Sequence, residues 1–213
     1  MTVDALVFDA YGTLYDVHSV ARRCESCFPG KGAQLSQLWR AKQLEYTWQR
    51  SLMQRYVPFS QVTRDALAYS CAALGLSHRE HEAALMAEYL HLAPFPEARA
   101  ALERFKVKRA ILSNGSPDML DPLVRNSGLK LDAVLSVDEL KIFKPAPQVY
   151  ELAVKRLQVP KERIGFVSSN CWDALGAKSY GFTVYWVNRV GAPVDALGFA
   201  PDAQVKSLDE ILR

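Results

Sequence analysis

The stretch Asp4-Ala5-Leu6-Val7-Phe8-Asp9-Ala10-Tyr11-Gly12-Thr13 decides the fold that this sequence predicts. It is a short apolar run that ends on an acid, and a glycine suited to a tight bend follows three residues later. This pattern is typical of a buried strand that places an aspartate, Asp9, at its carboxyl end.

Similar short runs rich in β-branched residues recur much later in the chain, at 107–112, 133–136, 164–168 and 182–187. Helical patterns lie before and between them, at 96–105, 117–126, 146–157 and 172–180, and Gly128 and Gly181 mark the ends of two of these helices. Strands that alternate with helices predict an α/β fold with a Rossmann-like parallel sheet that helices cover on both faces.

The segment that follows the first strand differs, because it contains no convincing strand. Helices are predicted there over 32–56, 60–75 and 79–92. We therefore expect two domains. An α/β core domain, which is catalytic, comprises 1–15 and 96–213, and a helical-bundle cap domain is inserted at 16–95.

The longest predicted helix, 32–56, is apolar on two sides. One face carries Leu38, Ala41, Glu45, Trp48 and Leu52, and another carries Trp39, Tyr46 and Met53. A helix of this kind packs on two sides. We expect one side to cover its own bundle and the other to face the core domain or a second subunit, so a homodimer is expected.

Composition and charge exclude several classes of protein. The chain has 213 residues, a net charge of +3, 49% hydrophobic and 23% charged residues, which are ordinary values for a soluble globular protein. No apolar run reaches the ~18 residues of a membrane span, and the N-terminus has no basic leader. We expect a cytoplasmic protein that binds neither nucleic acid nor a membrane.

The cysteines and histidines suggest no site of their own. Cys24 and Cys27 form a CxxC, but a redox or zinc site would need a second pair or a thioredoxin-like context. Free thiols in a reducing cytoplasm are the simpler interpretation. All the histidines lie in the helical insert and no GxSxG motif occurs, which disfavours a histidine-driven hydrolase.

Polar residues follow the predicted strands of the core. In an open parallel sheet, ligands bind beyond the carboxyl ends of the strands. Each of these residues alone could cap a helix or be a solvated charge. Their recurrence at successive strand ends predicts one crevice lined by Asp9 and Thr13, by Ser113, Asn114 and Gly115, by Lys144, and by the segment 168–173.

Four segments resemble the four motifs of the haloacid dehalogenase superfamily: FDAYGT (8–13), SNG (113–115), KIFKP (141–145) and VSSNCWDALGA (167–177). The resemblance covers essentially the whole chain, because the helical insert sits where that superfamily carries its cap. The chain is similar more closely to the L-2-haloacid dehalogenases through DAYGTL (9–14), LWRAKQLEYTW (38–48), SNGSPDML (113–120) and SSN-x-WD-x-x-GA (168–177).

This resemblance implies hydrolysis of L-2-haloalkanoic acids to D-2-hydroxyalkanoic acids through an ester on Asp9, without a cofactor or metal. It implies catalytic roles for Asp9, Thr13, Lys144, Tyr150, Ser168, Asn170 and Asp173. It implies that the 2-haloacid and the released halide contact Ala10, Tyr11, Arg40, Leu44, Phe59, Ser113, Asn114 and Trp172.

Two alternatives stay open. A metal-dependent phosphatase of the same superfamily would need an acid two residues after Asp9 to protonate the leaving alkoxide, and further carboxylates to hold Mg²⁺. Tyr11 occupies that position and 168–172 contains no carboxylate, which suits a halide, since a halide leaves without a proton. A non-enzymatic member of the fold is hard to reconcile with the joint presence of Asp9, Lys144 and Asp173.

Overall fold

The computed structural model describes residues 3–211 and contains a six-stranded parallel sheet. Its strands are β1 (Ala5–Phe8), β2 (Lys108–Ser113), β3 (Ala133–Ser136), β4 (Ile164–Ser168), β5 (Thr183–Val187) and β6 (Ala203–Val205). The order β3-β2-β1-β4-β5-β6 is that of a doubly wound Rossmann sheet. The Rossmann-like parallel sheet expected from the sequence is thus confirmed.

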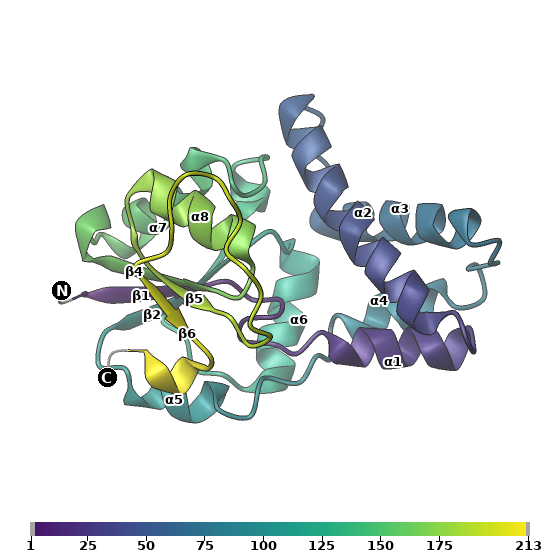
Figure 1. Cartoon of the computed structure of the whole chain (residues 1–213), viewed down its shortest axis with the longest axis horizontal. Helices are drawn as coiled ribbons and strands as arrows, with labels where there is room; N and C mark the ends of the chain where they lie inside the picture. The colour runs from purple at the N-terminus through teal and green to yellow at the C-terminus, as the bar shows by residue number, and fades with distance from the viewer. Residues whose placement is uncertain (1–2, 212–213) are drawn as a thin grey trace.

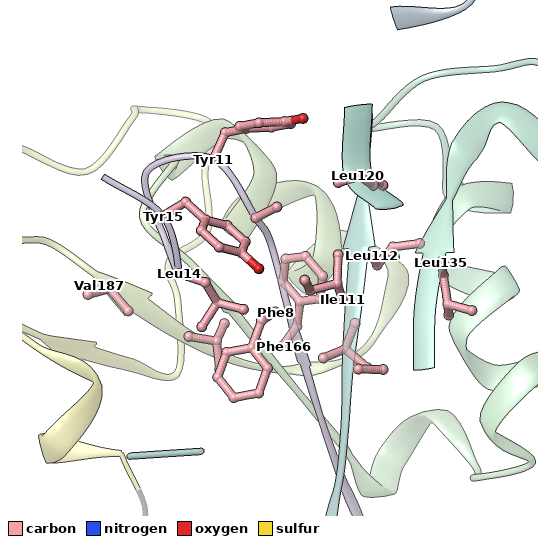
Figure 2. Packing of buried hydrophobic residues seen from close by; sticks show 14 of the residues in the cluster. Phe8, Tyr11, Leu14, Tyr15, Ile111, Leu112, Leu120, Leu135, Phe166 and Val187 are labelled. Atoms are coloured by element: carbon pink, nitrogen blue, oxygen red, sulfur yellow. The ribbon is translucent and has the colours of Figure 1, made fainter. Parts of the chain in front are cut away.

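Helices cover both faces of this sheet: α5 (Ala98–Arg104), α6 (Pro117–Ser127), α7 (Pro147–Leu157) and α8 (Cys171–Tyr180). Right-handed crossovers place α5 and α6 on one face and α7 and α8 on the other (Figure 1). The core is densest around β1, whose four residues are completely buried. There Phe8 lies beside Ile111 of β2 (Figure 2), and its ring stacks on that of Phe105 with centroids 6.0 Å apart.

Two glycines end helices of the core, as the sequence predicts. Gly128 (φ 64°) follows α6 and Gly181 (φ 114°) follows α8, and both adopt the left-handed conformation that glycine tolerates best. Within residues 3–211 there are also three short 3₁₀ segments: η1 (Val137–Glu139), η2 (Lys161–Arg163) and η3 (Leu208–Glu210).

The inserted helices form a bundle beyond the carboxyl ends of the central strands (Figure 1). They are α1 (His18–Cys27), α2 (Gly32–Leu52), α3 (Phe59–Ala73) and α4 (Glu82–Glu88). The two connections to the core run side by side: Asp16 N–H donates to Ala93 O (2.8 Å) and Phe95 N–H to Leu14 O (2.9 Å). The helical cap expected from the sequence is therefore present.

Several predicted elements need correction. Helix α1 was not expected, because its sequence is polar and buries only Val20 and Cys24. The helix predicted over 79–92 spans only Glu82–Glu88. The helix predicted over 32–56 ends at Leu52, and Gln54 (φ 55°) turns the chain without a glycine. Strand β6 was also missed, since three residues on a sheet edge show no clear alternation.

The apolar faces of α2 are covered less evenly than expected. Leu35, Trp39, Gln43 and Thr47 face the bundle and are buried. Leu52 and Met53, by contrast, are 86% and 59% exposed, so within one chain the end of this helix covers neither the bundle nor the core. Among the described helices, none combines the length and apolar composition that crossing a membrane requires.

Candidate active site

The site lies where β1 and β4 end side by side, at the point where the strand order reverses. Asp9 directly follows β1, and its N–H donates to Val167 O of β4 (2.9 Å). Ligands of doubly wound sheets bind at this kind of switch point. The neighbouring strand β2 brings Ser113 and Asn114 to the same edge.

A buried lysine joins two carboxylates at this point. Lys144 Nζ donates to Asp9 Oδ1 (3.2 Å) and to Asp173 Oδ2 (2.9 Å). Lys144 is 1% exposed, Asp173 is fully buried and Asp9 is 7% exposed. Three charges with a net value of −1 therefore sit in a dry environment, where charge interactions are strong.

Burial and charge act in opposite directions on the pKa values of this group. Burial lowers the pKa of Lys144, but the carboxylates of Asp173 and Asp9 outweigh it and raise that pKa above the ordinary value. Burial raises the pKa of Asp173, and Lys144 opposes this only in part. Asp173 is thus a stronger base than an exposed aspartate, which suits it to accept a proton from water.

The second oxygen of Asp9 is held from two further directions. Asp9 Oδ2 accepts hydrogen bonds from Asn170 Nδ2 (2.9 Å) and Thr13 Oγ1 (3.2 Å). Thr13 Oγ1 is itself held by the N–H of Ser169 (2.9 Å), and the N–H of Asn170 donates to Ser168 Oγ (3.2 Å). The Asp9 carboxylate is consequently fixed in one orientation by three donors.

Tyr150 on α7 holds the carboxylate of Asp173, which lies on α8. Its hydroxyl donates to Asp173 Oδ1 (2.9 Å), and burial raises the pKa of Tyr150, which keeps the hydroxyl protonated. Gly176 makes this approach possible, because a Cβ there would lie 2.4 Å from the Tyr150 oxygen. Tyr150 therefore positions Asp173 and lies behind the cavity.

The cap contributes a guanidinium to the opposite side of the site. Arg40 on α2 donates to Gln43 Oε1 (2.7 Å) and, across the domain junction, to Asn170 Oδ1 (3.4 Å). Within residues 3–211, Arg40 makes no ion pair with a carboxylate. An uncompensated cation at this place attracts an anion.

The cap and the core enclose a small cavity over Asp9, with an accessible volume of about 10 Å³. It is lined by Asp9, Tyr11, Arg40, Leu44, Phe59, Ser113, Asn114, Lys144, Asn170 and Trp172. All of these are site residues expected from the sequence. The other five, Ala10, Thr13, Tyr150, Ser168 and Asp173, lie behind this lining.

Several donors of the site have no acceptor in the part of the chain that the structure describes. The N–H groups of Ala10 and Tyr11 are two of them. The Tyr11 hydroxyl and Trp172 Nε1 are buried side-chain atoms without a hydrogen-bond partner. Ser113 Oγ accepts from Gly115 N–H (3.0 Å), which leaves its own proton to donate. Such a concentration of unused donors is suited to an anionic ligand.

Two further polar residues connect the site: Gln43, which the sequence did not predict, and Ser169, which lies in the predicted segment 168–173 but was given no role. Gln43 is fully buried and links Arg40 to Thr63 Oγ1 (2.8 Å). Ser169 connects Thr13 to Trp186, whose Nε1 donates to Ser169 O (3.1 Å). The signal for Gln43 was available, since it continues the buried i, i+4 row of Leu35 and Trp39.

The site offers few side chains suited to bind a metal ion or to act as a reactive thiol. Over residues 3–211, no three His, Cys, Asp or Glu side chains converge on a point that could hold a metal ion. The ammonium of Lys144 already occupies the space between the oxygens of Asp9 and Asp173. Cys24 and Cys27 are free thiols on α1.

Comparisons with known proteins agree with this geometry. A model of the haloacid dehalogenase-like hydrolase family matches residues 3–181. The (S)-2-haloacid dehalogenase H-109 of Pseudomonas putida is 49% identical, over 98% of this chain and 96% of its own. An (S)-2-haloacid dehalogenase of Xanthobacter autotrophicus is 52% identical over 88% of this chain and 76% of its own.

A solved structure adds a chemical observation. The L-2-haloacid dehalogenase of Xanthobacter autotrophicus with chloropropionic acid covalently bound superimposes with a TM-score of 0.91 at 43% identity, covering 97% of this chain and 96% of that one. These matches span the core, the cap and every segment of the site. The chain therefore belongs to the haloacid dehalogenase superfamily of hydrolases and, within it, to the L-2-haloacid dehalogenase family.

Proposed function

We propose that this chain is an (S)-2-haloacid dehalogenase, which hydrolyses L-2-haloalkanoic acids to D-2-hydroxyalkanoic acids through an ester on Asp9. The observation that carries the proposal is the Asp9 carboxylate, which three donors aim into a closed cavity opposite the unpaired guanidinium of Arg40. The covalent chloropropionate adduct of the Xanthobacter relative supports the ester.

In the first half-reaction, an Asp9 oxygen attacks the α-carbon of the substrate. The new C–O bond forms as the carbon–halogen bond breaks, and the electron pair of that bond leaves with the halide. No proton is transferred, which fits the presence of Tyr11 where a phosphatase carries its acid. The guanidinium of Arg40 and the free N–H groups of Asn114 and Trp172 stabilise the departing halide.

In the second half-reaction, water attacks the carbonyl carbon of the Asp9 ester. Asp173 accepts a proton from that water, and Ser168 and Asn170 help to orient it. Cleavage of the acyl–oxygen bond then restores the Asp9 carboxylate, and the departing alkoxide takes up the proton. Because the α-carbon is attacked only once, its configuration is inverted overall.

The remaining groups bind the substrate. The hydroxyl of Ser113 and the N–H groups of Ala10 and Tyr11 are the donors placed to hold the substrate carboxylate. Leu44, Phe59 and the rings of Tyr11 and Trp172 give the cavity an apolar wall for the substrate side chain. Exclusion of water by the cap strengthens the charge interactions inside.

We also propose domain boundaries, assembly and location. The antiparallel pair of connections supports boundaries near 15 and 95. Exposed Met53 (59%) and Tyr69 (45%), both in the cap, support a homodimer, which analytical ultracentrifugation would test.

We place the protein in the cytoplasm on account of its unpaired thiols.

Halide release tests the proposed function. L- and D-2-chloropropionate are supplied in excess EDTA, and a phosphate ester with Mg²⁺ is assayed in parallel. We expect chloride from the L form only, with no effect of EDTA. Mg²⁺-dependent phosphate release without chloride would contradict the proposal and favour a phosphatase.

A further inference from the structure

We propose that an apolar groove beside the active site, formed by the end of α2 and by residues 142–146, binds the alkyl chain of longer 2-haloalkanoates. We further infer that Trp48 controls access to it. This inference rests on the proposed function, since it assigns a substrate range to the same site.

The groove is larger than the cavity over Asp9 and is open to solvent. It offers about 440 Å³ and is lined by Trp48, Ser51, Leu52, Ile142, Phe143, Lys144, Pro145 and Ala146. Its two polar side chains are engaged elsewhere. Ser51 Oγ donates to Thr47 O and accepts from Phe143 N–H, and the ammonium of Lys144 binds Asp9 and Asp173. The surface left for a ligand is therefore apolar.

Only a thin partition separates this groove from the cavity. Lys144 lines both spaces, and the ring of Trp48, which lines the groove, meets the ring of Trp172, which lines the cavity. The two rings contact edge to face with centroids 5.6 Å apart. Displacement of Trp48, together with the Trp172 ring that it supports, would join the two spaces.

The ring of Trp48 is held more weakly than the rings of Trp39 and Trp186. Trp39 Nε1 donates to Thr63 O (2.8 Å) and Trp186 Nε1 to Ser169 O (3.1 Å), and both rings are buried. Trp48 is 37% exposed and, among residues 3–211, forms no hydrogen bond through its indole. A ring contact alone shifts an equilibrium only about two- to tenfold, so Trp48 can move.

An alkyl group that extends along the cavity wall on the side of Trp172 would reach this partition. In the proposed mechanism, Ser113 holds the carboxylate on the side formed by β2, and Arg40 holds the halide on the side formed by α2. Asp9 faces the α-carbon. A long third substituent would extend past Trp172, which belongs to the apolar wall, and past the stem of Lys144. A long alkyl group needs more space than this small cavity leaves beside the reacting groups, and the groove is the adjoining apolar space. Each buried methylene strengthens binding at most about fourfold.

Charge placed in the groove tests the inference. Leu52→Glu adds a carboxylate at a side chain that is 86% exposed, so the fold tolerates it. Leu197→Glu, the same replacement at a leucine that is 61% exposed outside the groove, is the matched control. The substrates are L-2-bromopropionate and L-2-bromooctanoate, and kcat/KM is measured for each.

We expect the unaltered protein to turn over both acids. Leu52→Glu should lower kcat/KM for bromooctanoate at least about tenfold and leave bromopropionate within about twofold, whereas Leu197→Glu should change neither. Trp48→Ala should raise the preference for the longer acid. An equal loss for both acids in Leu52→Glu, or turnover of bromopropionate but not bromooctanoate by the unaltered protein, would overturn the subsite. No halide from either acid would overturn the proposed function itself.

Discussion

The core and the cap contribute to the same cavity in different ways. The core supplies the charged groups of the reaction, Asp9, Lys144 and Asp173, which are almost completely buried and bound to one another. The cap supplies Arg40, Leu44 and Phe59, and its guanidinium reaches the core through one long hydrogen bond of 3.4 Å to Asn170.

This difference follows from the elements that carry the residues. The strand ends of a parallel sheet are fixed by neighbouring strands, so catalytic side chains placed there keep their geometry. The cap is joined to the core by two connections and a few side-chain contacts, such as that of the Tyr56 hydroxyl with Asp138 (2.8 Å). We infer that the core determines the reaction and the cap determines what is admitted to it.

Replacement of the nucleophile should have the largest effect. Asp9→Asn keeps the shape of the side chain but removes the attacking oxygen anion, so kcat should fall at least about 10⁴-fold. Lys144 retains Asp173 as a partner, so Tm should stay within about 4 °C. Halide release and thermal unfolding measure the two quantities, and ordinary turnover by this variant would exclude the ester.

Removal of the buried lysine should damage both activity and stability. Lys144→Met leaves Asp9 and Asp173 buried without a counter-charge, which should cost about 3–5 kcal/mol of unfolding free energy and at least about 10³-fold in kcat.

The stability loss in Lys144→Met should depend on pH. Without Lys144 the pKa of Asp173 in the folded protein rises further above its unfolded value, so the folded state binds more protons. The loss should therefore be larger at pH 8 than at pH 5, as urea unfolding can show. The opposite trend would mean that this lysine does not neutralise the carboxylates.

A change in the cap should affect rate without comparable loss of stability. Arg40→Ala should lower kcat about 10²-fold for a chloro acid, and less for an iodo acid, because iodide needs less stabilisation as it departs. Since Arg40 makes only hydrogen bonds to neutral amides, unfolding should change by about 1 kcal/mol. An unfolded variant would instead show that Arg40 has a structural role.

The smallest effect is expected at Tyr150. Its hydrogen bond lowers the pKa of Asp173, which burial raises. Activity should thus decline on the acid side at a pH above that of an ordinary aspartate, as Asp173 becomes protonated. Tyr150→Phe should move that decline to higher pH and cost about tenfold in kcat at its plateau. A pH profile of kcat that does not move would remove Asp173 from the role of base.

The sequence predicted the core better than the cap. Strands β1 to β5 and the residues at their ends were found because buried parallel strands are continuous apolar runs punctuated by polar residues. Helix α1 and the end of α2 were misjudged, because their boundaries depend on tertiary packing and a non-glycine turn at Gln54. Gln43 was missed, since a glutamine on a helix usually faces solvent.

The groove at Trp48 could not have been found from the sequence either. It depends on how closely α2 approaches residues 142–146, which lie about 90 residues later in the chain. Only the folded arrangement shows that Trp48 and Leu52 border the active site.

The central claim is that water attacks the Asp9 ester, and isotope labelling tests it most directly. A single turnover of L-2-chloropropionate, with enzyme in excess, is run in H₂¹⁸O and followed by mass spectrometry of the product and of the peptide that contains Asp9. We expect unlabelled D-lactate and one ¹⁸O in the Asp9 carboxylate. Labelled lactate with an unlabelled Asp9 would mean that water attacks the α-carbon directly, and would contradict the account.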